Sequence, residues 1–309
     1  MPESKSCVAV FGVGRSGTSL AMKLLNGVGL RLSPDLVPPS PDNPTGHFED
    51  LRINRAQQGL IKSIGMYALL PRPADWVSAP AYLETKKTLV AIVEEEVNRD
   101  YRPWGFKDPR TCLFWPLWEE VLRELDITPH VVFCVRPSSS VVSSLMTAYG
   151  LPQDLSEGIV LYRTFHALRD VQHPFFFLHY DRWQQDPISR ITALAAHCGL
   201  DGQGVDMEGI IRENIRPELN REGLSKLQLS TSLLELDHLL ASFDGSDYDP
   251  ERIDYWCQSV EKSMDDLDFI LRGVERLYRL NGIQLFRTHP KGRSFVVRTK
   301  AVLKRYLRR

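Results

Sequence analysis

A short apolar stretch runs into a glycine-rich turn near the start of the chain. Residues 8–11 (VAVF) have the unalternated apolar character of a strand that is buried on both faces. Residues 12–19 (GVGRSGTS) follow, and the amphipathic residues 18–30 predict a helix. A strand, a glycine turn and a helix in this order direct backbone N–H groups and the positive helix end to one place. The sequence predicts an anion-binding turn; the alternative is a tight turn without a ligand.

Further strand-like stretches, each followed by a helical stretch, predict the fold class. Residues 131–135 (VVFCV) and 174–178 (PFFFL) are apolar throughout, and residues 104–107 (WGFK) form a weaker candidate strand. Apolar strands that alternate with helices favour an α/β fold, with a parallel sheet flanked by helices. Beyond about residue 201 the pattern becomes helical and polar, and residues 253–281 are the longest candidate helix. We therefore predict an α/β core over about 5–200, a helical extension over about 201–286, and a separate tail over 287–309.

The residues of the glycine turn narrow the choice of anionic ligand. Gly12, Gly14 and Gly17 match the dinucleotide pattern GxGxxG, but residues 31–35 (RLSPD) do not form the second strand that this pattern requires. A Walker A loop requires lysine where this chain has Thr18. Metal-triphosphate chemistry depends on that lysine, so the turn is not that of an ordinary NTPase. The turn adds further phosphate-compatible donors of its own, namely Arg15, Ser16, Thr18 and Ser19.

Two groups of cations follow the predicted strands. Arg136 comes directly after residues 131–135, and Ser144 follows it eight residues later. Lys107 and Arg110 belong to a KDPR turn at the end of residues 104–107. Open parallel sheets bind ligands at the carboxyl ends of their strands, so both groups are candidate ligand residues. The alternatives are a solvated arginine beside a serine-rich helix cap, and a salt-bridged surface turn.

Charge is distributed unevenly along a chain whose net charge is −1. Residues 287–309 hold nine Lys or Arg and no Asp or Glu, which leaves 1–286 with a net charge of −10. An acidic body argues against a nucleic-acid partner. The tail fits a basic amphipathic helix on an anionic membrane, or equally a solvated terminal helix. Five scattered cysteines and the lack of a secretory signal predict a cytoplasmic protein.

In combination, these motifs resemble those of the sulfotransferases that use 3′-phosphoadenosine-5′-phosphosulfate (PAPS). Residues 14–20 resemble the loop that binds the 5′-phosphosulfate, and Arg136 with Ser144 resembles the 3′-phosphate pair. The KDPR turn is similar to a turn of bacterial members, and residues 179–187 are similar to a Y-[ED]-D-L…DP segment of the family. The match runs in order from about residue 8 to 200. It departs from the family where Pro137 directly follows Arg136, where Trp183 replaces leucine, and where Arg15 replaces the lysine of cytosolic members.

The resemblance implies a P-loop-like sulfotransferase domain over 1–286 that transfers a sulfuryl group from PAPS without a metal. Its acceptor would be a hydroxyl, or an amine, of a carbohydrate or glycolipid. The resemblance implies that the donor is bound by the loop and the 3′-phosphate pair: Gly14, Arg15, Ser16, Gly17, Thr18, Ser19, Arg136 and Ser144. It assigns catalytic roles to Lys107 and Arg110.

Residues 43–50 (NPTGHFED) resemble the segment that carries the general base of bacterial members. On this resemblance Glu49 is the expected base, and His47 is the alternative. Glu49 and Asp50 also precede a predicted helix over 51–64, where acidic residues favour the helix N-terminus.

Two other functions remain open on the sequence. One is a nucleotide or small-molecule kinase with an atypical P-loop. The other is a non-catalytic, membrane-associated protein that binds phosphate. Neither the acceptor nor the oligomeric state can be read from the residues.

Overall fold

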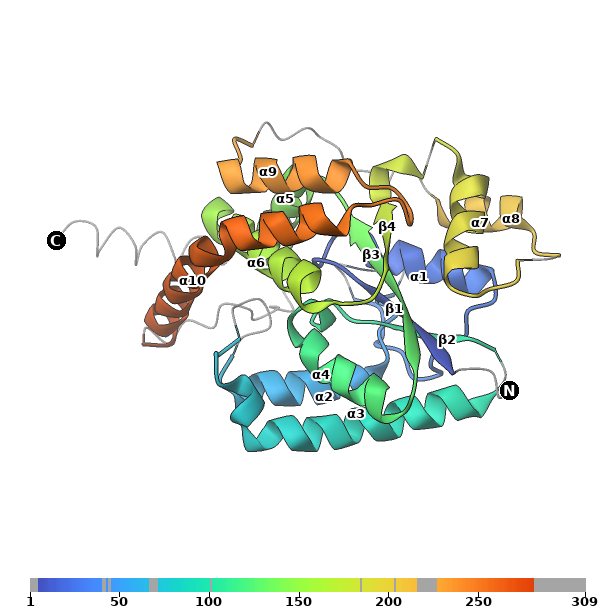
Figure 1. Ribbon diagram of the computed structural model, residues 1–309, viewed down its shortest axis with the longest axis horizontal. Helices are drawn as coiled ribbons and strands as arrows, with labels where there is room; N and C mark the ends of the chain where they lie inside the picture. Colours follow the sequence, from blue (N-terminus) through green and yellow to red (C-terminus); the bar gives the residue numbers. More distant parts are fainter. Residues whose placement is uncertain are drawn as a thin grey trace.

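The computed structural model describes residues 5–40, 43, 46–66, 72–100, 102–183, 185–202, 204–215 and 227–280, with the side chains of the last segment described up to residue 266. The tail over 287–309, and with it the predicted membrane contact, lies outside these residues. Four parallel strands form one sheet in the order β2-β1-β3-β4 (Figure 1). They are β1 (Ser6–Phe11), β2 (Trp104–Lys107), β3 (Thr128–Val135) and β4 (Phe175–His179). The predicted α/β class with a parallel sheet is confirmed.

Side chains of β1 alternate between two apolar clusters because successive residues of a strand point to opposite faces. Val8 and Val10 pack with α1 (Thr18–Gly27) and α7 (Pro187–His197), and α8 (Met207–Asn214) packs against these helices. Cys7, Ala9 and Phe11 belong to the larger cluster on the other face. Figure 1 shows the three helices of the first face gathered on one side of the sheet.

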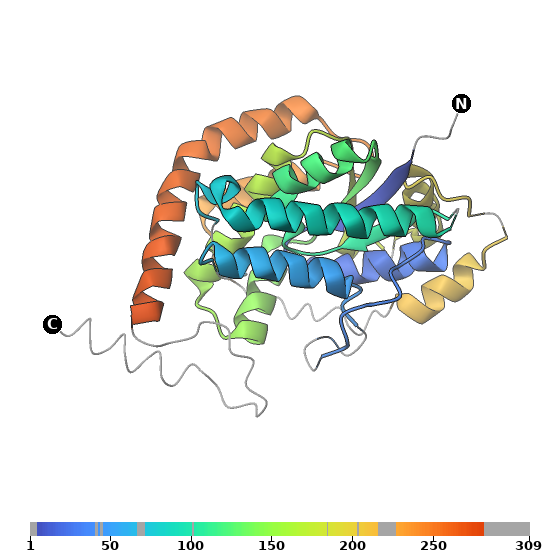
Figure 2. The ribbon, with the colours of Figure 1, turned by 90° about the horizontal axis from the view of Figure 1, so that it is seen from below.

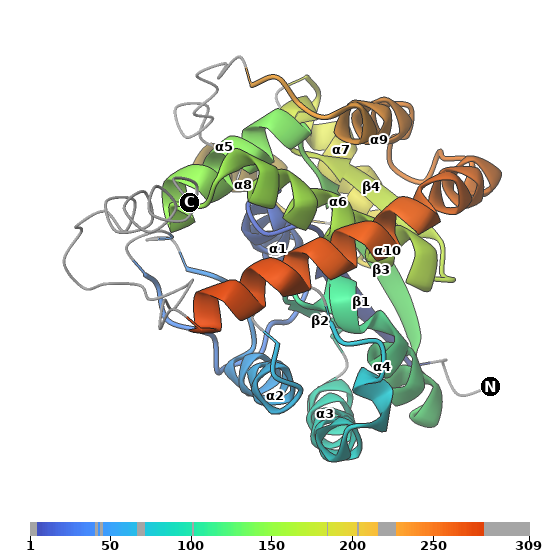
Figure 3. The same cartoon turned by 90° about the vertical axis from the view of Figure 1, so that its left-hand side faces the viewer.

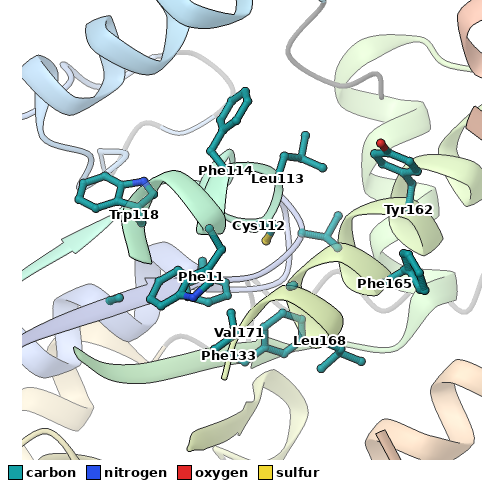
Figure 4. Packing of buried hydrophobic residues seen from close by; sticks show 14 of the residues in the cluster. Phe11, Cys112, Leu113, Phe114, Trp118, Phe133, Tyr162, Phe165, Leu168 and Val171 are labelled. Atoms are coloured by element: carbon teal, nitrogen blue, oxygen red, sulfur yellow. The ribbon is translucent and has the colours of Figure 1, made fainter. Parts of the chain in front are cut away.

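The larger cluster is rich in aromatic side chains from β1, β2, β3 and the helix α4 (Thr111–Glu124) (Figure 4). Phe106 stacks on Trp118 with 4.1 Å between ring centroids, and Phe11 lies 5.3 Å from Trp115. Burial of a large aromatic side chain contributes roughly 1.5–3 kcal/mol, so this cluster fixes α4 firmly against the sheet.

Two further helices cover this face on the β2 side. They are α2 (Leu51–Ser63) and α3 (Pro80–Arg99), which lie side by side in Figure 2 and contact each other. A short 3₁₀ helix, η1 (Trp76–Ser78), precedes α3. Arg31, which follows the first helix, forms an ion pair with Glu96 of α3, and both side chains are at least 95% buried. This pair ties the α2–α3 layer to the β1–β2 edge.

Helices on the opposite edge form the remainder of the molecule. They are α5 (Ser138–Tyr149), α6 (Gln153–Asp170), α9 (Thr231–Ala241) and the long α10 (Pro250–Leu280). A 3₁₀ turn, η2 (Tyr180–Arg182), follows β4. Figure 3 shows α10 crossing α6, and the two helices are in contact. The predicted helical extension after residue 201 is confirmed by α8, α9 and α10.

Several predicted boundaries need correction. The first helix ends at Gly27 rather than residue 30, and β4 covers Phe175–His179 rather than 174–178. The strand β3 begins at Thr128, three residues earlier than predicted, because Ser6 pairs with Thr128. All five cysteines are buried free thiols. Within the described part of the chain, no helix is both long and apolar enough to cross a membrane.

Candidate active site

The carboxyl ends of all four strands converge on one edge of the sheet. The chain leaves β1 toward β2 on one side, and leaves β3 toward β4 on the other, so the strand order reverses between β1 and β3. In open α/β sheets ligands bind at this switch point. The glycine turn follows β1, and Arg136 follows β3, so the two predicted anion sites are neighbours. The KDPR turn after β2 packs on the same loop, because a Cβ on Gly14 would lie 3.9 Å from the Cβ of Pro109.

Gly17 is the residue that the loop geometry requires. Its backbone φ is +98°, a conformation that residues with a side chain rarely adopt. A Cβ at this position would lie 2.6 Å from Cδ2 of Tyr180, the residue that follows β4. Gly17 also precedes the first residue of α1, so Tyr180 packs close to the N-terminal end of that helix.

Arg15 also has a positive φ, 79°, which is uncommon for a residue other than glycine. Two contacts hold it in this conformation. Its Nε donates to Oγ of Ser144 on α5 at 3.0 Å, and its carbonyl oxygen accepts from Nη1 of Arg136 at 3.3 Å. Strain of this kind costs on the order of 1–3 kcal/mol and persists where surrounding contacts compensate for it. The structure therefore brings Arg15, Arg136 and Ser144 together. The hydroxyl of Ser144 is bonded to the side chain of Arg15.

Arg136 is oriented by an aromatic ring. Its guanidinium carbon lies 4.6 Å from the centroid of the Tyr180 ring. Two residues further on, α5 begins, and its N-terminus is bound by Asp237 of α9: the carboxylate accepts from Ser138 N at 3.1 and 3.2 Å and from Ser138 Oγ at 2.6 Å. The N-terminus of α5 is therefore already paired with a carboxylate. After β3 it is Arg136 that points toward the loop, where it donates to the carbonyl oxygen of Arg15.

The hydroxyl groups of the loop have different surroundings. Ser16 is 3% exposed, and its Oγ has no hydrogen-bond partner among the described residues. A buried hydroxyl without a partner costs about 1–3 kcal/mol, so a bound ligand or water would stabilise it. Ser19 is different, because its Oγ donates to the carbonyl oxygen of His47 at 3.2 Å. Thr18 is buried at the start of α1.

The KDPR turn and Glu49 form a buried cluster of charges. Lys107 Nζ donates to Glu49 Oε1 at 2.8 Å, and Arg110 Nη2 donates to Glu49 Oε2 at 3.1 Å. Arg110 also donates its Nε and Nη2 to the two carboxylate oxygens of Asp108, at 2.8 and 2.7 Å. Asp108 is fully buried, and burial raises its pKa against the opposing charge of Arg110. The turn is salt-bridged, as one alternative expected, but it is buried beside the loop rather than on the surface.

The surroundings of Glu49 lower the pKa of its carboxyl. Burial alone would raise the pKa of its carboxyl, but the charges of Lys107 and Arg110 and the hydrogen bonds from Lys107 and Asn54 lower it overall. The neighbouring Asp50, rather than Glu49, caps α2, since its side chain accepts from the backbone N–H of Arg52 and Ile53. The helix cap and the buried carboxylate are therefore two different residues.

His47 lies on the other side of the same cluster. Its Nε2 is 2.7 Å from Oγ of Ser40, which belongs to the proline-rich loop over residues 34–44, a segment with five prolines in the sequence. Its carbonyl oxygen accepts from both Ser19 Oγ and Lys107 Nζ, at 3.2 and 3.1 Å. This carbonyl connects the start of α1 to the Lys107–Glu49 pair.

Sequence reasoning missed three side chains of the site. Asn54, one turn into α2, donates Nδ2 to Glu49 Oε2 at 2.7 Å, and its Oδ1 accepts from Gln58 at 2.7 Å. Arg163 of α6 is 2% exposed and donates to the carbonyl oxygen of Pro109 at 3.3 Å. Asp237 binds the start of α5. The spacing of Asn54 and Gln58 on a helix face was the available signal for the first; nothing local indicates the other two.

Comparisons with known proteins add the following. The fold is similar to solved structures that include the "Sulfotransferase Domain from the Synechococcus PCC 7002 Olefin Synthase", at 16% identity and a TM-score of 0.48, covering 79% of this chain and 98% of that one. Another is sulfotransferase STF9 from Mycobacterium avium, at 16% identity and a TM-score of 0.47, covering 78% of this chain and 77% of that one. No protein-family model matches the sequence, and no curated protein matches it. Similarity this low carries no argument about activity.

The arrangement is suited to a ligand with several negative charges. Arg136 contacts Arg15 of the glycine loop, and Lys107 shares the carbonyl oxygen of His47 with Ser19. Arg110 lies beside Lys107 on Glu49, and the loop adds backbone donors and the N-terminus of α1. The described residues contain no group of three or more His, Cys, Asp or Glu that could hold a metal ion. A carboxylate beside two cations at the same edge supplies a candidate proton acceptor.

Proposed function

We propose that the protein is a PAPS-dependent sulfotransferase that transfers a sulfuryl group to a hydroxyl, or an amine, of a carbohydrate or glycolipid acceptor. One observation carries the proposal. Cations from the loop and from the ends of β2 and β3 surround a glycine cradle in which Thr18 stands where an NTPase has lysine. A ligand with several separated anionic groups fits this set of donors better than a metal-bound triphosphate does.

The residues present fit such a donor. The backbone from Gly14 to Ser19 and the unpaired hydroxyl of Ser16 offer hydrogen bonds to a 5′-phosphosulfate. The side chain of Arg15 contributes charge to the same group. Arg136, which lies against Tyr180, with Ser144 beside Arg15, would bind the 3′-phosphate, the group that distinguishes PAPS from ATP.

The proposed reaction is an in-line displacement. The acceptor oxygen forms a bond to sulfur while the bond between sulfur and the 5′-phosphate oxygen breaks, and the acceptor proton passes to Glu49. Lys107 and Arg110 stabilise the charge that develops on the sulfonate and on the leaving phosphate. His47 is the second candidate base. Its ring contacts Ser40, whereas the carboxylate of Glu49 lies between the two cations.

The acceptor class rests on the family resemblance. The helical extension and the proline-rich loop flank the candidate site, and we propose that they bind the acceptor. We also propose that the basic tail over 287–309, outside the described residues, brings the protein to an anionic membrane surface.

Binding decides between the donor classes. We expect adenosine 3′,5′-bisphosphate to bind in isothermal titration calorimetry, and ADP with Mg²⁺ to bind much more weakly. Preference for ADP would instead support a kinase.

Turnover then tests the base. Glu49→Gln should keep its affinity for the bisphosphate and lose roughly 10²–10⁴-fold in transfer of sulfuryl from labelled PAPS. The matched variant His47→Gln should lose much less, and the reverse order would make His47 the base.

A further inference from the structure

Both carboxylate oxygens of Glu49 are hydrogen-bonded to side chains of the protein. Its Oε1 accepts from Lys107, and its Oε2 accepts from Arg110 and Asn54, at 2.8, 3.1 and 2.7 Å. The side chain is 9% exposed. The two cations that would stabilise a sulfonate are thus paired with a carboxylate of the protein itself.

The two cations are not held equally. Arg110 makes two additional hydrogen bonds to the carboxylate of Asp108, which fix its guanidinium. Among the described residues Glu49 is the carboxylate that pairs with Lys107, whose side chain is otherwise hydrogen-bonded to the carbonyl oxygen of His47 at 3.1 Å. Lys107 is therefore the member of the cluster that can change partners at the smaller cost.

Lys107 also lies close to the loop. The carbonyl oxygen of His47 accepts from both Lys107 Nζ and Ser19 Oγ, so one acceptor atom separates the ammonium group from the first turn of α1. A sulfonate that extends from a phosphate bound at the start of α1 would thus lie within reach of Lys107. Glu49, on the other side of the ammonium group, competes with that anion for it.

We infer that Glu49 sets the selectivity of the site between the sulfonated donor and the desulfonated product, by competing with the sulfonate for Lys107. This inference rests on the proposed function. Binding of the product leaves the Glu49–Lys107 pair intact. Binding of the donor draws Lys107 toward the sulfonate and places two negative groups near one ammonium group. Glu49 therefore lowers the affinity of the site for the donor but not for the product.

The experiment compares two affinities in one variant. Dissociation constants of PAPS and of adenosine 3′,5′-bisphosphate are measured by calorimetry, without acceptor, for the wild type and for Glu49→Gln. Glutamine keeps the shape of the side chain and removes its charge. We expect the affinity for PAPS, relative to the bisphosphate, to rise about tenfold. In the variant, donor binding no longer breaks the charge-assisted hydrogen bond between Lys107 and Glu49, and a factor of about ten corresponds to one such bond. The control Glu94→Gln removes an exposed charge on α3 and should leave the ratio unchanged.

A double variant tests whether Lys107 carries the effect. In a Lys107→Met background, the additional change Glu49→Gln should alter the ratio by less than about threefold, since the shared cation is gone. An unchanged ratio in Glu49→Gln, or the same tenfold rise in the Lys107→Met background, would overturn the inference. A cooperative unfolding transition in urea shows that each variant is folded. Failure of the wild type to bind either adenosine ligand would instead refute the proposed function.

Discussion

Gly17→Ala tests the contact between the loop and the end of β4. The new methyl group would lie 2.6 Å from Cδ2 of Tyr180, well inside contact distance, and the residue would keep a φ of +98°. The left-handed backbone costs roughly 1–2 kcal/mol for a residue with a Cβ. Overpacking adds about 1–3 kcal/mol, because Tyr180 is itself held against Arg136. The lower entropy of the unfolded alanine chain returns about 0.4–1 kcal/mol.

We therefore expect Gly17→Ala to lower the free energy of unfolding by about 1–5 kcal/mol in urea denaturation. The same substitution in a Tyr180→Ala background separates the two causes, because only the backbone strain remains there. Its cost should fall by about 1–3 kcal/mol relative to the wild-type background. Equal costs in the two backgrounds would show that Tyr180 does not restrict this position, and the described packing of η2 on the loop would be wrong.

Two further predictions concern strain and pH. Arg15→Gly relieves the positive φ that Arg15→Ala retains, so the alanine variant should be less stable by about 1 kcal/mol in urea denaturation, while both lose affinity for the bisphosphate; equal stability would contradict the strain. Burial lowers the pKa of His166 to about 4. Below pH 6.5 the unfolded chain takes up a proton that the folded protein excludes. The stability present above pH 6.5 is therefore lost as the pH falls toward 4. The loss in the free energy of unfolding is up to about 3 kcal/mol. His166→Gln should flatten the pH dependence of this free energy, measured by urea denaturation between these pH values. An unchanged pH dependence would show that other groups cause it.

The strands were largely predictable from the sequence because their residues are apolar throughout. The strands β1, β3 and β4 are apolar runs, and their ends were predicted to within three residues. The helix α6 was not predicted, because it is buried nearly all round between α4, α5, α9 and α10. Its buried polar residues, such as Arg163 and His166, interrupt the helical periodicity that would have indicated one apolar face.

The site was predictable as a set of charges but not as a set of pairs. Arg15, Lys107, Arg110 and Arg136 stand in the turns after strands, where parallel sheets present ligand residues. The pairing of Lys107 with Glu49 joins positions 58 residues apart in the sequence, and it depends on how the segment before α2 lies against the end of β2. No local pattern encodes such a contact, because the chain between the two residues forms α2 and α3.

The low pKa of Glu49 at first argues against its role as a base, since an effective base has a pKa near the working pH. The proposed exchange of Lys107 resolves this conflict. When the sulfonate draws Lys107 away, Glu49 loses the partner that contributes most to lowering its pKa and gains a negative neighbour, so its affinity for the acceptor proton rises. Once the sulfuryl group has left on the acceptor, Lys107 returns and the proton is expelled. In this proposal Glu49 is a stronger base only while the donor is bound. The ion pair with Lys107 keeps the resting carboxylate weakly basic, and its return after each transfer restores the deprotonated carboxylate.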